Sequence, residues 1–151
     1  MALAFKVSIE GANEVLRAFD KLPKDAEQEL REQAFDIAKV LADRIKAAGR
    51  RHSRQAARAA STVREVKGRW PIVQASNTGR AKGLLFGSEF GMTRKSGWYA
   101  KRRYFDSRGS QFGPHLGGGS YWFFKTADEM QPYVASEWSK VADAVVRKWS
   151  A

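Results

Sequence analysis

Residues 24–49 read KDAEQELREQAFDIAKVLADRIKAAG, which is the longest regular pattern in the chain. Apolar side chains recur there every three or four residues, the period of one helix face, at Ala26, Leu30, Ala34, Ile37, Leu41 and Ile45. The first turns are rich in acidic residues, which the helix dipole favours. The stretch predicts a long amphipathic helix from about Asp25 to a C-cap near Gly49. Phe35 and Ala42 widen its apolar face, which indicates packing in more than one direction.

Two elements are expected before this helix. Residues 3–9 alternate apolar and other side chains, which predicts a half-buried strand with one apolar face formed by Leu3, Phe5, Val7 and Ile9. Gly11 and Asn13 interrupt the alternation, and Asn13 is suited to cap a short helix that runs through Leu22. Pro23 then ends that helix before the long one begins.

The segment after the long helix predicts strands. Residues 50–60 are rich in alanine and arginine, so they are expected to extend the long helix or to fray from it. Residues 62–75 predict two strands joined by a turn at 67–68, and Pro71 either places the second strand at a sheet edge or delays its start. A further strand is expected at Leu84–Phe90.

The C-terminal region predicts a second helix. The cluster at 121–124 is expected to form a strand or an extended wedge into the core, and Thr126 with Glu129 has the spacing of a capping box. Pro132 fits the first position of the main helix. Its apolar stripe is formed by Val134, Trp138, Val141, Val145 and Trp149. Residues 1–151 therefore predict a single α+β domain, with a small, mainly antiparallel sheet packed by the long helix and the C-terminal helix.

Charge is distributed unevenly along the chain. The sequence has 27 Lys and Arg against 16 Asp and Glu, a net charge of +11. Residues 1–49 sum to −1 (8 − 9), residues 50–110 to +12 (15 − 3) and residues 111–151 to zero (4 − 4). A positive field concentrated in one third of the chain indicates a polyanionic partner, either nucleic acid or an acidic protein face. The alternative is a basic loop that serves solubility alone.

The glycine-rich region carries most of this charge. Residues 76–120 contain 10 of the 13 glycines, with aromatic residues placed between basic ones. A stretch of this length without regular structure is unusual inside a compact domain and is typically functional. We expect residues 92–120 to form an extended inter-subunit arm or loop that becomes ordered in an assembly.

Catalytic and cofactor chemistry is poorly represented. The absence of cysteine excludes disulfides and thiolate metal sites. His52 and His115 are too few for a zinc site, and no phosphate-binding glycine motif occurs. We therefore expect no metal, no cofactor and no enzymatic activity, and the shortage of histidines and paired acids also counts against a small nuclease. No apolar run approaches the ~20 residues of a membrane helix, and the first residues do not resemble a signal peptide, so we expect a soluble protein made inside the cell.

Interaction chemistry is better represented. Contact with DNA or an acidic partner is expected from basic residues of the middle third: Arg50, Arg51, Arg54, Arg94, Lys95, Lys101, Arg102, Arg103 and Arg108. Aromatic residues between them are candidate anchors of the arm on a neighbouring subunit: Trp98, Tyr99, Tyr104 and Phe105. A third set is expected to define the fold, with Gly91 at a turn after a core strand where a positive φ is useful: Glu89, Phe90, Gly91, Phe123 and Phe124.

Three stretches resemble the head–tail joining, or tail-completion, proteins of long-tailed bacteriophages. Residues 6–23, KVSIEGANEVLRAFDKLP, followed by the long helix, resemble the opening strand, glycine turn, short helix and long alanine-rich helix of that family. Residues 87–93, GSEFGMT, are similar to a strand ending in an E-F-G-T-type motif. Residues 122–127, WFFKTA, fall where the family has a P-F-L-R-P-A-like segment before its last helix.

The resemblance implies a structural virion protein of the phage neck. Such a protein forms a ring, expected to be sixfold, that completes the tail end or joins head and tail and lets DNA pass. It implies self-association, contacts with portal-side, neck, tail-tube or terminator proteins, non-specific contact with DNA and no membrane. Its expected location is the head–tail junction of the virion, after assembly in the host cytoplasm. The alternative is a free, non-specific nucleic-acid-binding protein.

Overall fold

A computed structural model describes residues 2–6, 9, 11–92 and 112–150 of the chain. Its elements follow the order β1 (Ala2–Lys6), α1 (Ala12–Phe19), α2 (Lys24–His52), α3 (Arg54–Ala60), β2 (Arg64–Val66), β3 (Ile72–Ser76), the 3-10 turn η1 (Gly79–Ala81), α4 (Leu85–Phe90) and α5 (Phe123–Ser150). The predicted α+β class is confirmed. Within the described residues, no helix combines the length and the apolar character needed to cross a membrane.

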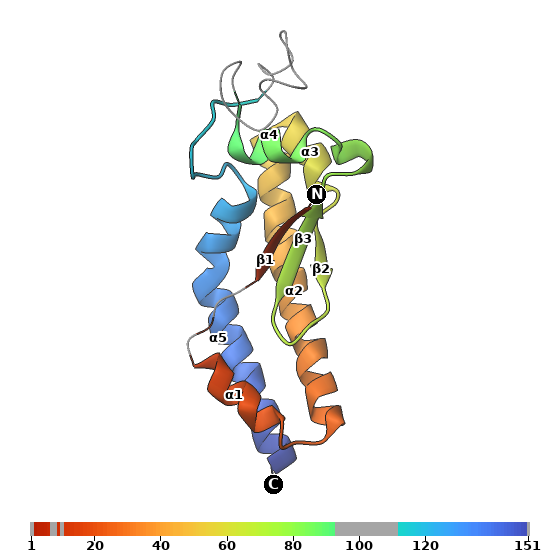
Figure 1. The fold of residues 1–151 in the computed structure, drawn as a ribbon, viewed down its shortest axis with the longest axis vertical. Coiled ribbons are helices and arrows are strands. Elements are labelled where there is room, and N and C mark those ends of the chain that lie inside the picture. The colour runs from red at the N-terminus through yellow and green to blue at the C-terminus, as the bar shows by residue number, and fades with distance from the viewer. Residues whose placement is uncertain (1, 7–8, 10, 93–111, 151) are drawn as a thin grey trace.

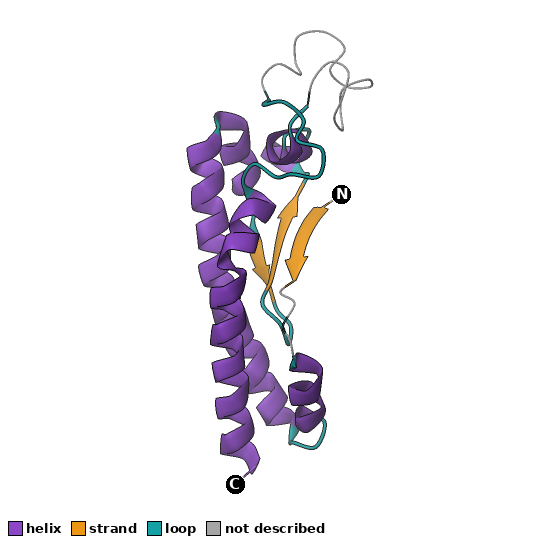
Figure 2. Ribbon diagram, turned by 90° about the vertical axis from the view of Figure 1, so that its left-hand side faces the viewer, coloured by secondary structure: helices purple, strands orange, loops and turns teal. Residues whose placement is uncertain are grey.

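The two long helices form the body of the molecule. α2 and α5 pack side by side along its length, and the sheet lies on one side of this pair (Figures 1 and 2). α1 packs on α5 at the end where the C-terminus lies, and α3 and α4 lie at the opposite end. The apolar stripe predicted for α2 is buried, as are its counterparts Val134, Trp138 and Val145 on α5. Each large aliphatic side chain buried in this way contributes about 1.5–3 kcal/mol.

The sheet has three antiparallel strands in the order β1-β3-β2. Leu3 pairs with Ala75 and Phe5 with Val73, which places these side chains on the same, inward face. Of the two alternatives predicted for the second strand, the delayed start is confirmed and the edge position is wrong, because β3 is the central strand. Pro71 lies one residue before β3, so its missing N–H falls outside the ladder and only the start of the strand is delayed.

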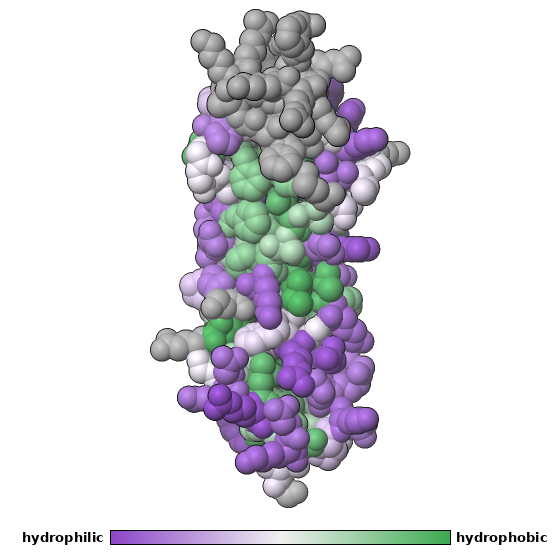
Figure 3. Space-filling model, viewed as in Figure 1, coloured by the Kyte–Doolittle hydropathy of each residue, from purple (hydrophilic) through white to green (hydrophobic). Residues whose placement is uncertain are grey.

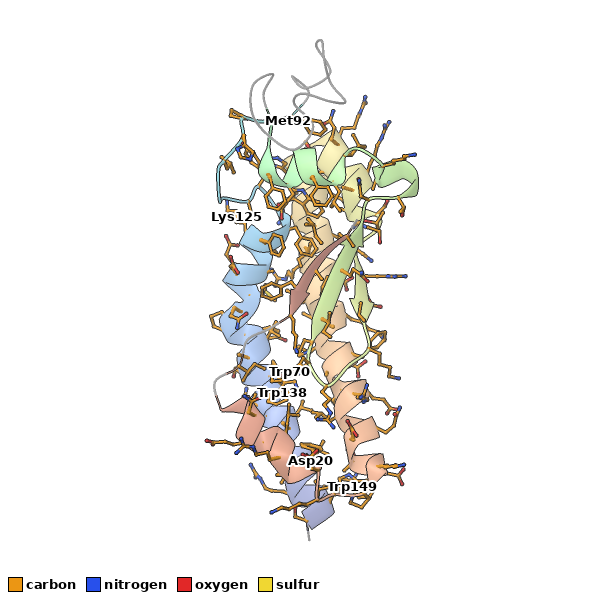
Figure 4. The ribbon with its side chains drawn as sticks, in the orientation of Figure 1. Asp20, Trp70, Met92, Lys125, Trp138 and Trp149 are labelled. Atoms are coloured by element: carbon orange, nitrogen blue, oxygen red, sulfur yellow. The ribbon has the colours of Figure 1, made fainter. Side chains whose placement is uncertain are left out.

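The β2–β3 hairpin is attached to α5 by tryptophans. Trp70 stacks on Trp138 with ring centroids 5.2 Å apart, and Trp138 Nε1 donates to the carbonyl oxygen of Arg69 at 2.7 Å (Figure 4). Further toward the C-terminus, Trp149 Nε1 donates to the Glu29 carboxylate at 2.9 Å and joins α5 to α2. These contacts fix the sheet and both long helices relative to one another.

The expected ends of the first helices are corrected by the structure. β1 ends at Lys6, and α1 begins at Ala12 after Gly11, whose φ is +77° and which supplies no side-chain cap. Asn13 is therefore inside the helix instead of capping it, and the helix ends at Phe19 instead of Leu22. Residues 7 and 8 of the expected strand lie outside the described residues.

Gly49 is not the C-cap of the long helix. α2 continues through Gly49 to His52, and the break falls at Ser53, whose Oγ accepts the Ala56 N–H at 3.0 Å and caps α3. A Cβ at Gly49 would lie 2.7 Å from the Cβ of Ala60 and 3.0 Å from the ring of Trp122. The glycine is thus required by the close approach of α3 and Trp122, not by the end of a helix.

Two expected strands are helices. The segment expected as a strand at Leu84–Phe90 contains the helix α4 (Leu85–Phe90). Because residues 85–89 are all buried, their sequence shows neither a helical nor a strand period. Residues 123 and 124 begin α5, so the strand or wedge expected at 121–124 is also wrong. Pro132 lies inside α5 instead of at its first position. The helix already begins at Phe123, so Thr126 and Glu129 lie within it and do not form a capping box at its start. The cap that permits this early start comes from a distant residue, as described below.

Candidate functional site

Glu89 carries a completely buried carboxylate at the end of α4, with 0% of the residue exposed. Its Oε1 accepts the N–H groups of Trp122 (3.0 Å) and Phe123 (2.9 Å) and the hydroxyl of Ser120 (2.7 Å), and its Oε2 accepts the N–H of Phe124 (2.8 Å). These amides lie immediately before and in the first turn of α5, where backbone donors lack partners within the helix. A side chain from α4 therefore caps the N-terminus of α5.

The environment of this carboxylate explains its role. Burial raises the pKa of the Glu89 carboxyl above its usual range, while the hydrogen bonds from Trp122, Phe124, Ser120 and Phe123 act in the opposite direction. Because four donors surround it and no part of it reaches solvent, the carboxylate is a structural acceptor within this joint.

Backbone hydrogen bonds strengthen the joint between α4 and the start of α5. The Tyr121 N–H donates to the Glu89 carbonyl oxygen at 2.7 Å, and the Leu116 N–H donates to that of Phe90 at 3.1 Å. Gly91 follows with a φ of +73°, so the positive φ expected for this glycine is confirmed, although it ends a helix instead of a strand. The turn directs the chain back beneath residues 113 and 114.

Aromatic rings fill the space around the cap. Phe90 stacks on Phe86 and on Phe124, with centroid distances of 6.3 and 6.2 Å, and Phe123 meets Phe124 edge-on at 5.0 Å. Trp122 packs edge-on against Phe123 at 5.9 Å and is itself buried. The structure thus brings together all five residues of the fold-defining set at one joint.

The same joint holds both ends of the 93–111 segment. Met92 (1% exposed) and Phe112 (8% exposed) are buried on either side of it, and the Met92 N–H donates to the Gly113 carbonyl oxygen at 2.8 Å. Gly87 leaves room for the Phe112 ring, because a Cβ at this position would lie 2.8 Å from the ring. The residues that flank the segment are therefore held together at one point, which we call the arm base, at the end of the molecule marked by Met92 in Figure 4.

Three of the predicted contact residues lie at the same end of the molecule. Arg50 and Arg51 in the last turn of α2 and Arg54 at the start of α3 are exposed. Among the described residues none of them forms an ion pair, whereas ion pairs occur at Glu27–Arg31, Asp36–Lys39, Arg69 with Asp20 and Glu27, Glu137–Lys140 and Glu29–Lys148. These arginines are available to an anionic partner.

The remaining predicted contacts lie outside the described residues. They are Arg94, Lys95, Lys101, Arg102, Arg103 and Arg108, with the expected anchors Trp98, Tyr99, Tyr104 and Phe105. Of the expected arm at 92–120, residue 92 and residues 112–120 are described, and they form the arm base and the loop that leads to α5.

Several residues of the arm base were not predicted from the sequence. Ser88 accepts the Trp122 Nε1–H at 3.2 Å, Ser120 Oγ accepts the Lys125 N–H at 3.0 Å, and the Tyr121 hydroxyl donates to the Pro114 carbonyl oxygen at 2.7 Å. One signal was present: Glu89 is the single acid in the apolar run 84–92, and an acid in such a run requires buried donors. Nothing local indicates which donors those are.

Comparison of the chain with protein-family models, with curated proteins and with solved structures found no match. In the part of the chain that the structure describes, no group of three or more His, Asp or Glu side chains is placed to hold a metal ion.

Proposed function

We propose that the protein is a structural component of the phage neck whose copies form a ring that completes the tail end or joins head and tail. The resemblance of residues 6–23 and 122–127 to head–tail joining proteins supports this, whereas residues 87–90 belong to the helix α4 and not to the strand that the resemblance implies. The elements at the start of the chain also support it, because a strand, a glycine turn, a short helix and a long helix follow in the order that the resemblance implies.

The observation that carries the proposal is the arm base. Residues 93–111 contain six basic residues and one acid, a net charge of +5, together with four aromatic residues. Nineteen residues (93 to 111) that start and end at one point can extend at most about 30 Å from it. A charged, aromatic segment anchored at both ends on a buried joint is suited to contact a neighbouring subunit, since Trp, Tyr and Arg dominate protein–protein contacts.

A second surface is suited to contact between copies. Within the described residues β1 pairs with β3 alone, so its other edge is open. Apolar side chains gather on the molecular face over the start of α5 and β1 (Figure 3). Phe90 of α4 and Phe124 of α5 are only partly buried. Contiguous exposed apolar surface of this kind typically marks a protein–protein contact.

In this account the protein acts passively, without turnover. Subunits close into a ring, dock on the adjacent neck, portal-side or tail proteins, and let DNA pass through the lumen. Six copies would carry a formal charge of about +66 (6 × 11), which favours non-specific contact with DNA or with acidic faces of adjacent rings. The expected place is the head–tail junction, after assembly in the host cytoplasm.

The triple change Lys101→Ala, Arg102→Ala and Arg103→Ala tests the role of the arm charge. In a phage that depends on the variant gene, we expect joined particles to fall about tenfold or more, which corresponds to a weakening of the subunit interface by about 1.4 kcal/mol or more. Counting joined particles by electron microscopy measures this. The matched control changes three exposed cations at the far end of the molecule, Arg17, Lys21 and Lys24, to alanine and should assemble normally. If the arm variant joined particles normally and still bound DNA, the arm charge would serve solubility only.

The exposed arginines without ion pairs favour one alternative, a free nucleic-acid-binding protein. That function predicts tight binding by the isolated chain, with a logarithm of affinity that falls steeply and linearly with the logarithm of salt concentration. The neck-ring function predicts weak, non-specific binding by the isolated chain.

A further inference from the structure

A cleft of about 270 Å³ lies between the last turn of α2 and the first turns of α5. Arg51 and His52 line it from α2, Tyr121 forms part of its wall just before α5, and Lys125, Thr126 and Glu129 line it from α5. Lys125 marks its position at the upper end of α5 in Figure 4. The cleft lies beside the arm base but is made entirely of described residues.

The cleft is positively charged. Arg51 and Lys125 are both exposed, and neither forms an ion pair with a described residue, although Glu129 lines the same cleft. Partial burial lowers the pKa of the His52 imidazole, and the nearby Lys125 ammonium lowers it further, so the field of Lys125 acts on another residue of the lining. With a neutral His52, the lining side chains carry a net charge of +1 (two cations and one acid).

The wall of the cleft is fixed before any ligand arrives. The His52 ring stacks on Tyr121 with centroids 4.9 Å apart and an interplanar angle of 30°. Tyr121 is held by its hydroxyl, which donates to the Pro114 carbonyl oxygen, and by its N–H, which donates to that of Glu89. A site whose wall is held in this way loses little conformational entropy on binding.

We propose that this cleft binds one phosphate group of a nucleic-acid backbone between the Arg51 guanidinium and the Lys125 ammonium. Arginine donates bidentate hydrogen bonds to phosphate oxygens, lysine adds a point charge, and the Thr126 hydroxyl is a further donor in the cleft. A polymer with repeated phosphates is favoured over an acidic peptide. The reason is that exposed cations continue away from the cleft along α2 and α3, at Arg50, Arg54 and Arg58. This proposal concerns the single chain and does not depend on ring assembly.

Fluorescence anisotropy of a labelled 20-base-pair DNA duplex with the isolated full-length chain tests the site. For Arg51→Gln with Lys125→Gln we expect binding to weaken about tenfold at low salt. The slope of log affinity against log salt should fall by about one, because the two cations together neutralise one backbone phosphate. The control, Arg17→Gln with Lys21→Gln, removes the same charge from exposed residues that form no ion pair within the described chain, at the opposite end of the molecule. It should change affinity by less than about twofold, because surface charges distant from the DNA are screened.

A second measurement reports on the cleft directly. Because His52 and His115 are the two histidines of the chain, the His115→Gln variant leaves the ring signals of His52 alone in the NMR spectrum. A phosphate bound beside Lys125 offsets its charge, so the duplex should raise the pKa of His52. Equal loss of affinity in the cleft and control variants, or an unchanged His52 pKa at saturating DNA, would overturn the proposal. The proposal would also be overturned if the cleft variant lost its binding to poly-glutamate but kept its binding to DNA, because the cleft would then be a site for an acidic protein. None of these outcomes bears on ring formation.

Discussion

Replacing Glu89 with alanine is expected to lower the free energy of unfolding by about 3–5 kcal/mol, because buried donors lose their acceptor and a cavity forms at the same time. The change removes the acceptor for three backbone N–H groups of α5 and for the Ser120 hydroxyl, and it leaves a cavity at a site with no exposed surface. Denaturant unfolding followed by circular dichroism measures the loss.

Two controls separate the hydrogen bonds from the general effect of losing a carboxylate. Glu89→Gln keeps the shape and one acceptor oxygen but turns an amide donor toward other donors, so it should cost about 1–2 kcal/mol. Glu32→Gln makes the same chemical change at an exposed position of α2 and should alter stability by less than about 0.5 kcal/mol. Equal effects of the two glutamine variants would contradict the assignment of Glu89 as the cap of α5.

The cap also has an expected pH dependence. Since the pKa of Glu89 is raised in the folded chain from an ordinary value of 4.5, the folded state holds this proton more tightly than the unfolded state. Ionisation of Glu89 therefore opposes folding as pH rises through the raised pKa. The pKa of Glu27 is lowered, chiefly by its hydrogen bond from Arg69, so ionisation of Glu27 favours folding as pH rises. This contribution is present in both chains and cancels in the comparison. The stability advantage of the natural chain over Glu89→Gln should thus be largest near pH 4 and shrink as pH rises.

Replacing Gly91 with alanine is expected to cost about 3 kcal/mol or more, because two unfavourable effects combine. Its φ of +73° is strained for any side chain, and a Cβ there would overlap the Pro114 carbonyl oxygen and lie 2.6 Å from its carbon. Since Met92 and Gly113 are hydrogen-bonded directly above this turn, the variant should also loosen the arm base. Hydrogen exchange of the Met92 amide would report the loosening.

The loop at 117–119 offers matched glycine controls. Gly117 has a φ of +67° but open space around it, so Gly117→Ala isolates the conformational strain and should cost about 1 kcal/mol. Gly118 has open space and no positive φ, so Gly118→Ala should leave stability almost unchanged or raise it slightly. A Gly91→Ala cost no larger than that of Gly117→Ala would show that the close approach of Pro114 does not require a glycine.

The two long helices were predictable from the sequence because each buries one face, so that apolar residues recur along the helix with a period of about 3.6 residues. α4 was not predictable in this way, since Leu85 to Glu89 are buried on all sides and no period remains. Gly49 was misassigned for a related reason. A glycine near the end of a helical pattern is typically a C-cap. Only the structure shows that Gly49 instead allows Ala60 and Trp122 to pack closely against α2.

The arm base was partly visible in the sequence. Glu89 and Gly91 stood out as an acid and a glycine in an apolar run. In the structure Glu89 caps α5, and Gly91 forms the turn after α4 with a positive φ. The partners of Glu89 lie more than thirty residues later in the chain, so their roles depend on tertiary packing that no local pattern encodes. The same holds for Met92 and Phe112, whose burial at one point brings the two ends of the 93–111 segment together.

The neck-ring function implies that a phage encodes this chain, and its most direct test is electron cryo-microscopy of purified virions of such a phage, with the protein identified in the particles by mass spectrometry. We expect a closed ring at the head–tail junction into which the α2–α5 body fits, with the arm base facing an adjacent subunit. The map would count the subunits directly. Absence of the chain from purified particles, or its presence only away from the junction, would contradict the proposal.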